Sequence, residues 1–221
     1  MTDTLTQDKP TTFTSADFFR IEKSNGIATI WMDFKHEKMN VVSPTLIEFF
    51  DETFNTLNND PEIKAGILIS AKPDFIAGAD IKSFNAEKPG DFVPITEKGQ
   101  AILNAIEKSK KPIVAAINGT CYGLGLEIAL ACQGRIASDN KKTKLALPEV
   151  KLCLLPGGGG TQRLPKLVGL QRSLDMMLTG KNIFAFPAKK MGLVDELVNH
   201  NKLHLAATAM ANRLIKSGPI Q

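Results

Sequence analysis

Apolar and polar positions along the chain alternate between the spacing of strands and the spacing of helices. Residues 18–23 and 27–34 are rich in β-forming residues, and the Ser-Asn-Gly sequence at 24–26 between them is a strong signal for a hairpin turn. Ser43-Pro44 then predicts a helix N-terminus, because serine is a favoured N-cap and proline is tolerated in the first turn. Apolar residues at helical spacing continue to Asp60-Pro61, where we expect this helix to end.

The same alternation continues to the end of the chain. Residues 65–70 and 113–117 are short apolar runs typical of buried strands, and between them apolar residues recur at helical spacing from Ile95 to Ile106. The later predicted elements are a helix at 126–132, a strand at 135–138 and helices at 162–168, 173–179 and 203–216. Strands that alternate with helices in this way indicate an α/β protein.

One acidic residue, Glu127, lies in the first turn of the most apolar of these helices. The segment 126–132 is otherwise apolar nearly all round and follows the glycines Gly123 and Gly125, so we expect the helix to be buried. Glu127 is then a carboxylate in a low dielectric near a helix N-terminus. It can complement the helix dipole or take part in catalysis, and the local sequence favours neither reading.

A second acidic residue, Glu149, lies between two short apolar segments. Pro148 stiffens the backbone before it, and four consecutive glycines at 157–160 follow it, which allows backbone to approach a ligand closely. A loop acid is usually only solvated. Two acids flanked by glycine-rich turns nevertheless favour paired acid/base chemistry by Glu127 and Glu149.

Three segments carry a resemblance to a known family. FIAGADIKSF at 75–84, AAINGTCYGLGLEIALAC at 115–132 and LPEVKLCLLPGGGGTQRLPKLVG at 147–169 resemble, in order and spacing, motifs of the enoyl-CoA hydratase (crotonase) superfamily. The likeness is greatest to the N-terminal hydratase/isomerase part of fatty-acid β-oxidation multienzyme alpha subunits. It implies a crotonase-like α/β spiral of ββα turns over residues 16–221, with the C-terminal helical part truncated. We expect residues 1–15 to be a disordered lead-in.

The resemblance also implies roles for individual residues. The two catalytic glutamates of the family fall on Glu127 and Glu149, and its oxyanion-hole amides fall on the backbone N–H groups of Ala79 and Leu124. Gly157 matches the glycine beside the catalytic water. The family usually reads GGG before this helix, so Leu124 departs from the pattern by placing a side chain where the acyl thioester is expected to pass.

Coenzyme A contacts are likewise implied by the resemblance, as part of an acyl-CoA thioester substrate. Four residues match the segments of the family that contact the coenzyme: Lys38, Met39, Ala77 and Lys82. Alanine at position 77 suits a place where ligand and backbone touch, although a tight turn has the same composition. We expect no metal and no redox cofactor.

Composition narrows the class of protein. The chain has 221 residues, of which 43% are hydrophobic and 23% charged, enough for one α/β domain. It lacks both the run of ~20 apolar residues that a membrane span needs and the pattern of a signal peptide. Cys121, Cys132 and Cys153 lie in apolar segments without CxxC spacing, so we expect reduced core thiols in a cytoplasmic protein.

Other functional classes find little support. The net charge of +4 is mild and does not indicate a nucleic-acid partner. The histidines His36, His200 and His204 lie outside the glycine-rich motifs, which leaves a Ser-His or Cys-His nucleophile without a base. His200 and His204 are four residues apart, but such a pair is more often a surface feature than a metal site. No GK[ST] follows the glycine run, which argues against a phosphate-binding loop.

Three functions follow as hypotheses. The first is hydration of trans-2-enoyl-CoA. The second is Δ3,Δ2-enoyl-CoA isomerisation by Glu149 alone, and the third is a non-catalytic acyl-CoA-binding or assembly domain, prompted by Leu124. The family's later helices are not found in the sequence, so we expect fusion to or association with downstream β-oxidation domains. A piece of this kind is expected to self-associate and to be weakly active, and a homo-oligomer stays open.

Overall fold

Two sheets organise the chain in the computed structural model, which describes residues 14–35, 37–81, 88 and 90–217. The larger sheet has six strands in the order β1-β2-β3-β4-β6-β9, with β1 antiparallel to β2 and every later pair parallel. Its strands are β1 (Phe19–Ser24), β2 (Ile27–Met32), β3 (Ala65–Ser70), β4 (Ile113–Ile117), β6 (Gly134–Ser138) and β9 (Glu196–Val198). The smaller sheet contains β5 (Thr120–Tyr122), β7 (Lys144–Ala146) and β8 (Ile183–Phe184).

The helices follow the predicted order. They are α1 (Pro44–Asn59), α2 (Val93–Glu107), α3 (Leu124–Ala131), α4 (Gly160–Val168), α5 (Leu170–Thr179), α6 (Ala185–Lys190) and α7 (Leu203–Ser217). Short 3-10 helices occur at η1 (Ser15–Asp17), η3 (Glu149–Leu152) and η4 (His200–Lys202). Helix α6 and the strands β5, β7, β8 and β9 were not predicted, because two to six residues are too few to show a periodic pattern.

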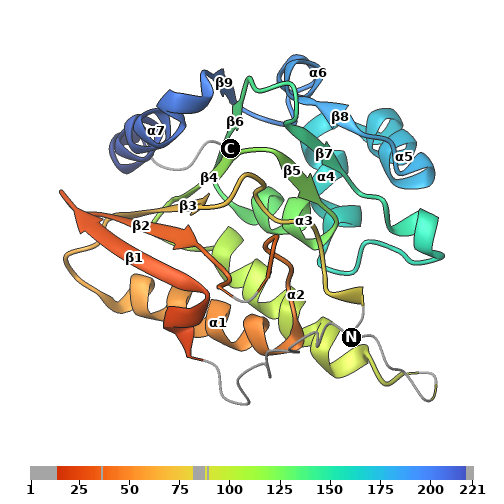
Figure 1. The fold of residues 1–221 in the computed structure, drawn as a ribbon, viewed down its shortest axis with the longest axis horizontal. Coiled ribbons are helices and arrows are strands. Elements are labelled where there is room, and N and C mark those ends of the chain that lie inside the picture. The colour runs from red at the N-terminus through yellow and green to blue at the C-terminus, as the bar shows by residue number, and fades with distance from the viewer. Residues whose placement is uncertain (1–13, 36, 82–87, 89, 218–221) are drawn as a thin grey trace, which may run out of the picture.

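Helices cover both faces of the larger sheet (Figure 1). Alternate residues of β3 and β4 point to opposite faces, so that Ile67 and Val114 pack with Met210 of α7, whereas Leu68 and Ile113 belong to the core formed with α1, α2 and α3. Every residue of β3 and β4 is therefore buried. This arrangement explains why both strands appear in the sequence as continuous apolar runs instead of alternating ones.

The local signals at the N-terminal end are confirmed. Asn25 and Gly26 adopt positive φ angles of 50° and 79° in the tight turn between β1 and β2. The Ser43 side chain accepts a hydrogen bond from Leu46 N at 3.2 Å, which caps α1, and Pro44 occupies its first turn. The described structure begins at Thr14, whose backbone carbonyl and side chain cap η1.

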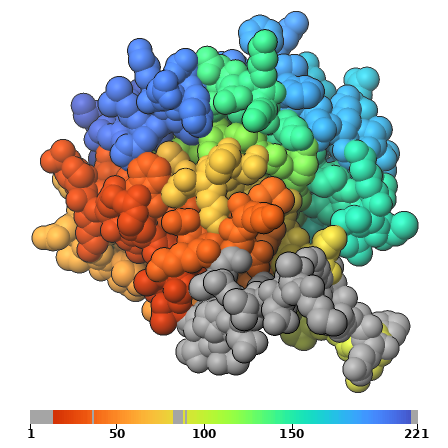
Figure 2. Space-filling view, viewed as in Figure 1, coloured from red at the N-terminus to blue at the C-terminus, as the bar shows by residue number. Residues whose placement is uncertain are grey.

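The first strands and the last helix lie side by side, as the red and blue surfaces in Figure 2 show. His204 Nε2 of α7 lies 3.1 Å from Thr29 Oγ1 of β2, and its ring is 5.3 Å from that of Trp31. His200 instead contacts Ser138 Oγ at 3.3 Å. The two histidines therefore serve separate surface contacts, and no group of three metal-ligating side chains occurs in the described residues. His36 lies outside them.

One expectation about the cysteines is wrong. Cys121 and Cys132 are buried, but Cys153 is exposed. It ends η3 with a positive φ of 57°, and this turn directs the chain outward before the glycine run. The apolar neighbours Leu152, Leu154 and Leu155, which suggested burial, are themselves 51%, 43% and 81% exposed. In the described part of the chain, no helix combines the length and apolar character that a bilayer span requires.

Candidate active site

The small sheet positions the segments that surround a cavity. Isolated parallel bridges join Val42 to Ala79 and Ile76 to Cys121, so the loop after β3 is held between the chain before α1 and strand β5. Asn40, fully buried, strengthens this arrangement by donating from Nδ2 to Ser70 Oγ at 2.8 Å and to the Phe75 carbonyl at 3.0 Å. Asn40 therefore acts in the structure as a scaffold residue.

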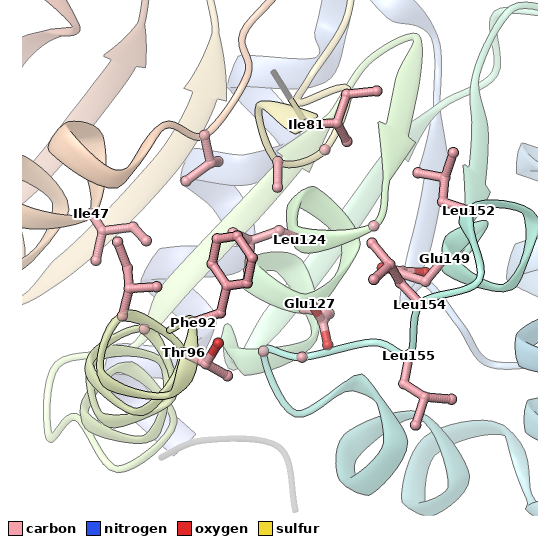
Figure 3. A pocket seen from close by; sticks show the side chains of 18 of the residues that line it. Ile47, Ile81, Phe92, Thr96, Leu124, Glu127, Glu149, Leu152, Leu154 and Leu155 are labelled. Atoms are coloured by element: carbon pink, nitrogen blue, oxygen red, sulfur yellow. The ribbon is translucent and has the colours of Figure 1, made fainter. Parts of the chain in front are cut away.

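The cavity beside this loop has a volume of about 520 Å³. Figure 3 shows Glu127 and Glu149 between two apolar walls, with Ile47, Phe92 and Leu124 on one side and Leu152, Leu154 and Leu155 on the other. Both predicted acids are thus brought together in one cavity, although they are 22 positions apart in the sequence, because η3 and the N-terminus of α3 meet there. A mostly apolar lining with two acids is suited to acid/base chemistry on an apolar substrate.

Glu127 is a buried carboxylate held by the glycine run. Its side chain is 2% exposed, and Oε1 accepts a hydrogen bond from Gly160 N at 2.7 Å. The pKa of Glu127 is raised, because burial outweighs the amides of Gly160 and Gly158 and the positive charge of Arg163, which act to lower it. Burial therefore disfavours the ionised form of Glu127, while the Gly160 amide and Arg163 stabilise that form.

The glycine run approaches Glu127 so closely that side chains at two of its positions would collide with the carboxylate. A Cβ at Gly158 would lie 2.8 Å from Glu127 Oε2, and one at Gly160 would lie 3.0 Å from Glu127 Oε1. Gly157, which the resemblance placed beside the catalytic water, lines the cavity instead of touching Glu127, and a Cβ there would meet only Thr96 Cγ2 at 3.8 Å. The run thus wraps the carboxylate with backbone.

Glu149 occupies the first position of η3 rather than an irregular loop. Its pKa is raised to about 7. Burial is the largest cause and the charge of Glu127 acts in the same direction, while the backbone amide of Glu149 itself acts to lower the pKa. Its Oε2 has no hydrogen-bond partner among the described residues. Glu149 Oε1 would lie 3.1 Å from a Cβ at Gly123, which has a positive φ of 52°. Burial is thus the main cause of a raised pKa at both cavity acids, and at Glu149 the result lies near neutral pH.

Two backbone amides at the cavity are available as donors. Ala79 and Leu124 both line the cavity, and neither N–H donates a hydrogen bond within the part of the chain that the structure describes. Leu124 is the first residue of α3, where helix N–H groups have no partner in the helix and the dipole favours negative charge. The two turns are in contact, since Gly78 Cα lies 3.8 Å from the Cβ position of Gly123.

The Leu124 side chain forms part of the cavity wall. Its Cδ1 would lie 2.8 Å from a Cβ at Gly158, and the side chain packs against the main core. Its amide keeps the position at the start of α3 that a glycine would have there. Leucine at this position therefore narrows the cavity between α3 and the glycine run without removing the donor.

The residues expected at the coenzyme divide into three groups. Ala77 lines the cavity together with Gly78 and Ala79. Lys38 and Met39 are exposed and are not among its lining residues, so their contact with coenzyme A stays a prediction. Lys82 lies outside the described residues, as does most of the polar segment 85–91.

Sequence comparison provides the family. The model for enoyl-CoA hydratase/isomerase matches residues 22–221. This chain belongs to that family. The fatty acid oxidation complex subunit alpha of Shewanella putrefaciens is 48% identical over 191 residues, which cover 86% of this chain and 27% of that protein. The corresponding subunit of Idiomarina loihiensis is 47% identical over 196 residues, covering 88% and 27%. The chain thus spans about a quarter of the length of these curated relatives.

Solved structures of the enoyl-CoA hydratase/isomerase family confirm the crotonase-like spiral. An enoyl-CoA hydratase from Geobacillus kaustophilus superposes with a TM-score of 0.84 at 33% identity, covering 90% of this chain and 75% of that one. An enoyl-CoA hydratase from Bacillus anthracis gives 0.82 at 30% identity, covering 91% and 78%.

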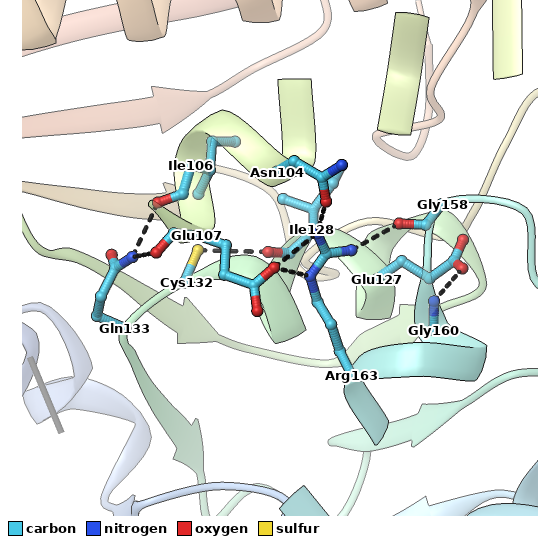
Figure 4. A network of polar contacts seen from close by, with 10 residues as sticks. All are labelled: Asn104, Ile106, Glu107, Glu127, Ile128, Cys132, Gln133, Gly158, Gly160 and Arg163. Atoms are coloured by element: carbon cyan, nitrogen blue, oxygen red, sulfur yellow. Dashed lines mark hydrogen bonds and ion pairs between the residues drawn. The ribbon is translucent and has the colours of Figure 1, made fainter. Parts of the chain in front are cut away.

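Sequence reasoning missed several residues that support or line the cavity. Arg163 donates from Nη1 to the Gly158 carbonyl at 2.9 Å and so holds the glycine run from behind (Figure 4). Gln100 of α2 donates to the Gly157 carbonyl at 2.7 Å, and Phe92 and Thr96 supply a cavity wall. The signal for Arg163 was an arginine three residues after the glycines on an apolar helix face, which is unusual for a solvated cation.

Proposed function

We propose that this chain hydrates trans-2-enoyl-CoA to 3-hydroxyacyl-CoA. The observation that carries the proposal is the pair Glu127 and Glu149 at one cavity, beside two backbone amides that have no partner among the described residues. Membership of the enoyl-CoA hydratase/isomerase family supports the same reaction class. Chemistry on an α,β-unsaturated thioester requires a proton donor, a group that activates water and stabilisation of negative charge on the thioester oxygen, and the cavity offers candidates for all three.

In the proposed reaction, Glu127 activates the water and Glu149 supplies the proton. Glu127 is assigned as the base because the Gly160 amide and the charge of Arg163 favour its ionised form and so oppose the effect of burial. Water adds its hydroxyl to Cβ as Glu127 accepts the remaining proton, and Glu149 transfers its own proton to Cα. The two carboxyls then exchange one proton with solvent, which restores the starting state. Where two carboxyl groups lie in different environments, the one whose ionised form is stabilised is assigned as the base and the other as the acid.

The amides of Ala79 and Leu124 are assigned to the thioester oxygen. Negative charge grows on this oxygen as water adds at Cβ, and donors that are fixed in advance stabilise it more than water does. One such donor typically changes the rate by about 10²–10³-fold. The α3 dipole adds to the effect at Leu124, because its positive end faces the cavity. Coenzyme A enters as part of the substrate.

A second candidate reaction is Δ3,Δ2-enoyl-CoA isomerisation. It is favoured by Glu149 Oε2, which has no partner among the described residues and can carry a proton between Cα and Cγ. Water and Glu127 are not needed for this transfer. A Glu127→Gln variant that loses hydration but retains isomerisation would show that Glu127 is needed for hydration alone.

The test of both reactions is substitution of each glutamate by glutamine. Glu127→Gln and Glu149→Gln are each expected to lower kcat for crotonyl-CoA hydration by about 10²–10⁴-fold, the usual range for an acid/base group. Glu97→Gln is the matched control, because Glu97 is exposed on α2 and does not line the cavity. Loss of the thioester absorbance in the ultraviolet reports hydration. Unchanged rates in both cavity variants would refute the proposal.

The non-catalytic alternative rests on Leu124, whose side chain occupies space in the cavity. Under that alternative, calorimetry would detect acyl-CoA binding while neither this chain nor a longer polypeptide turned substrate over. We infer that the chain instead works as the hydratase/isomerase part of a longer fatty acid oxidation alpha subunit, as its match to a quarter of such proteins supports. We then expect the chain alone to be less active and less stable than an extended polypeptide, and equal activity and thermal stability of the two would contradict this.

A further inference from the structure

Arg163 is a buried cation that joins two parts of the cavity wall. Only 7% of its side chain is exposed. Nε donates to Glu107 Oε2 at 2.9 Å and Nη2 to Asn104 Oδ1 at 2.6 Å, both on α2, while Nη1 donates to the Gly158 carbonyl at 2.9 Å. Figure 4 shows the guanidinium between α2 and the glycine run. Three nitrogens thus bind three different acceptors, which only the planar fork of arginine can reach together.

The contact with Gly158 acts directly on the environment of Glu127. Gly160 donates its amide to Glu127 Oε1, and the amide of Gly158 also acts to lower the pKa of Glu127. Arg163 holds the same short segment from its other side by the Gly158 carbonyl. A change in the position of this segment therefore changes the hydrogen bonds of Glu127. The helix α2 that anchors Arg163 also lines the cavity through Ile95 and Thr96.

The charge of Arg163 matters as well as its hydrogen bonds. Among the described residues, Glu127 is coupled to the charges of Arg163 from α4 and Glu149 from η3, which have opposite effects on its ionisation, and Asp91 lines the same cavity. Glu107 of α2 is paired with Arg163 and is 44% exposed, so solvent screens part of its charge. Cys132, also on α3, is buried, and desolvation raises its pKa to about 12, so it contributes no charge. Arg163 is thus the cation that favours ionisation of Glu127 over Glu149.

We propose that Arg163 is a positioning residue that fixes the glycine run against Glu127 and keeps Glu127 ionised, leaving Glu149 as the proton donor. This inference rests on the proposed hydration. Without Arg163, the two carboxyls would compete for one proton and the productive state, Glu127 ionised with Glu149 protonated, would become less populated. An ion pair that merely stabilises the fold would leave that distribution unchanged.

Two substitutions separate charge from geometry. Arg163→Gln removes the positive charge and the three-way hydrogen bonding. We therefore expect kcat for crotonyl-CoA hydration to fall by about 10–100-fold. The acid limb of the kcat/KM profile should move up by about 0.5–1 pH unit. Arg163→Lys keeps the charge but cannot reach three acceptors. It is expected to lower kcat by a smaller factor while its acid limb stays near that of the unchanged protein. Lys166→Gln, which removes an exposed positive charge from the same helix, is the control.

A direct titration of Glu127 makes the inference testable without activity. Carbon-13 NMR of glutamate carboxyls, with Glu127→Gln used for assignment, should show a higher Glu127 titration midpoint in Arg163→Gln than in the unchanged protein or Lys166→Gln. If the unchanged protein does not hydrate crotonyl-CoA, the proposed function fails, while the titration still decides the role of Arg163. An unshifted Glu127 midpoint in folded Arg163→Gln would overturn the inference. Should that variant not fold, full activity in Arg163→Lys would overturn it.

Discussion

Glu127 and Glu149 share one cavity, but the protein hydrogen-bonds only one of them there from the glycine run. Glu127 Oε1 receives the Gly160 amide at 2.7 Å, whereas Glu149 Oε2 has no partner within the described chain. The ionised form of Glu127 is therefore stabilised by specific contacts that Glu149 lacks. This asymmetry is the basis for the different roles proposed for the two side chains and leads to the predictions below.

The rate of hydration should decrease as the pH rises through about 7. Glu149, whose pKa is raised to about 7 by burial, must be protonated to supply the proton to Cα. Isomerisation of a 3-enoyl-CoA starts with removal of a Cα proton by ionised Glu149, so its kcat/KM should increase over the same range. Profiles for both substrates between about pH 5 and about pH 9 would check this. Parallel profiles for the two reactions would contradict it.

Stability should depend on the same carboxyl. The pKa of Glu149 is raised from its ordinary 4.5 to about 7, so the folded state holds a proton that the unfolded state releases in this interval. The contribution of protonated Glu149 to the free energy of unfolding is complete below about pH 4.5 and is lost as the pH rises through about 7. Glu149→Gln should therefore raise Tm at about pH 8 by about 1–3 °C, a small value because Glu149 is partly solvent-exposed. At about pH 5 the gain should be smaller, and an equal gain at both values would exclude the linkage.

The glycine run should not tolerate a methyl group where it touches Glu127. Gly160→Ala would place Cβ 3.0 Å from Glu127 Oε1, and Gly158→Ala would place it 2.8 Å from Glu127 Oε2. We expect each to lower stability by about 1–3 kcal/mol through overpacking and to decrease hydration at least tenfold. Gly157→Ala, whose Cβ meets only Thr96 Cγ2 at 3.8 Å, is the control for stability in urea unfolding. Equal midpoints for all three variants would show that the run can move away from Glu127.

Cysteine labelling should distinguish one thiol from the other two. Cys153 is exposed at the end of η3, whereas Cys121 and Cys132 are buried and burial raises the pKa of both thiols. A maleimide should react rapidly with one thiol per folded chain and with all three after denaturation. The single labelled peptide, found by mass spectrometry, should contain Cys153. Labelling of a Cys153→Ser variant at the unchanged rate would contradict the assignment.

Local sequence signals determined the elements whose structure depends on neighbours in the chain. Asn25 and Gly26 specify the hairpin turn because both adopt positive φ, and Ser43 specifies the start of α1 because its side chain caps Leu46 N. The burial of Glu127 also followed from sequence, since a helix that is apolar on every side has no face for solvent. The glycine run was recognised as a place of close backbone approach for the same local reason.

Only the tertiary structure decided what the two acids contact. The hydrogen bond between Gly160 and Glu127 joins residues 33 positions apart, and the raised pKa of Glu149 depends on its burial beside Gly123 at the start of α3. Arg163 shows the same limit, because its partners lie on α2, 56 and 59 residues earlier in the chain. Cys153 was misplaced because apolar neighbours in sequence line an open cavity instead of a core. Burial, partner choice and protonation depend on which segments meet in space, and periodicity along the chain does not contain that information.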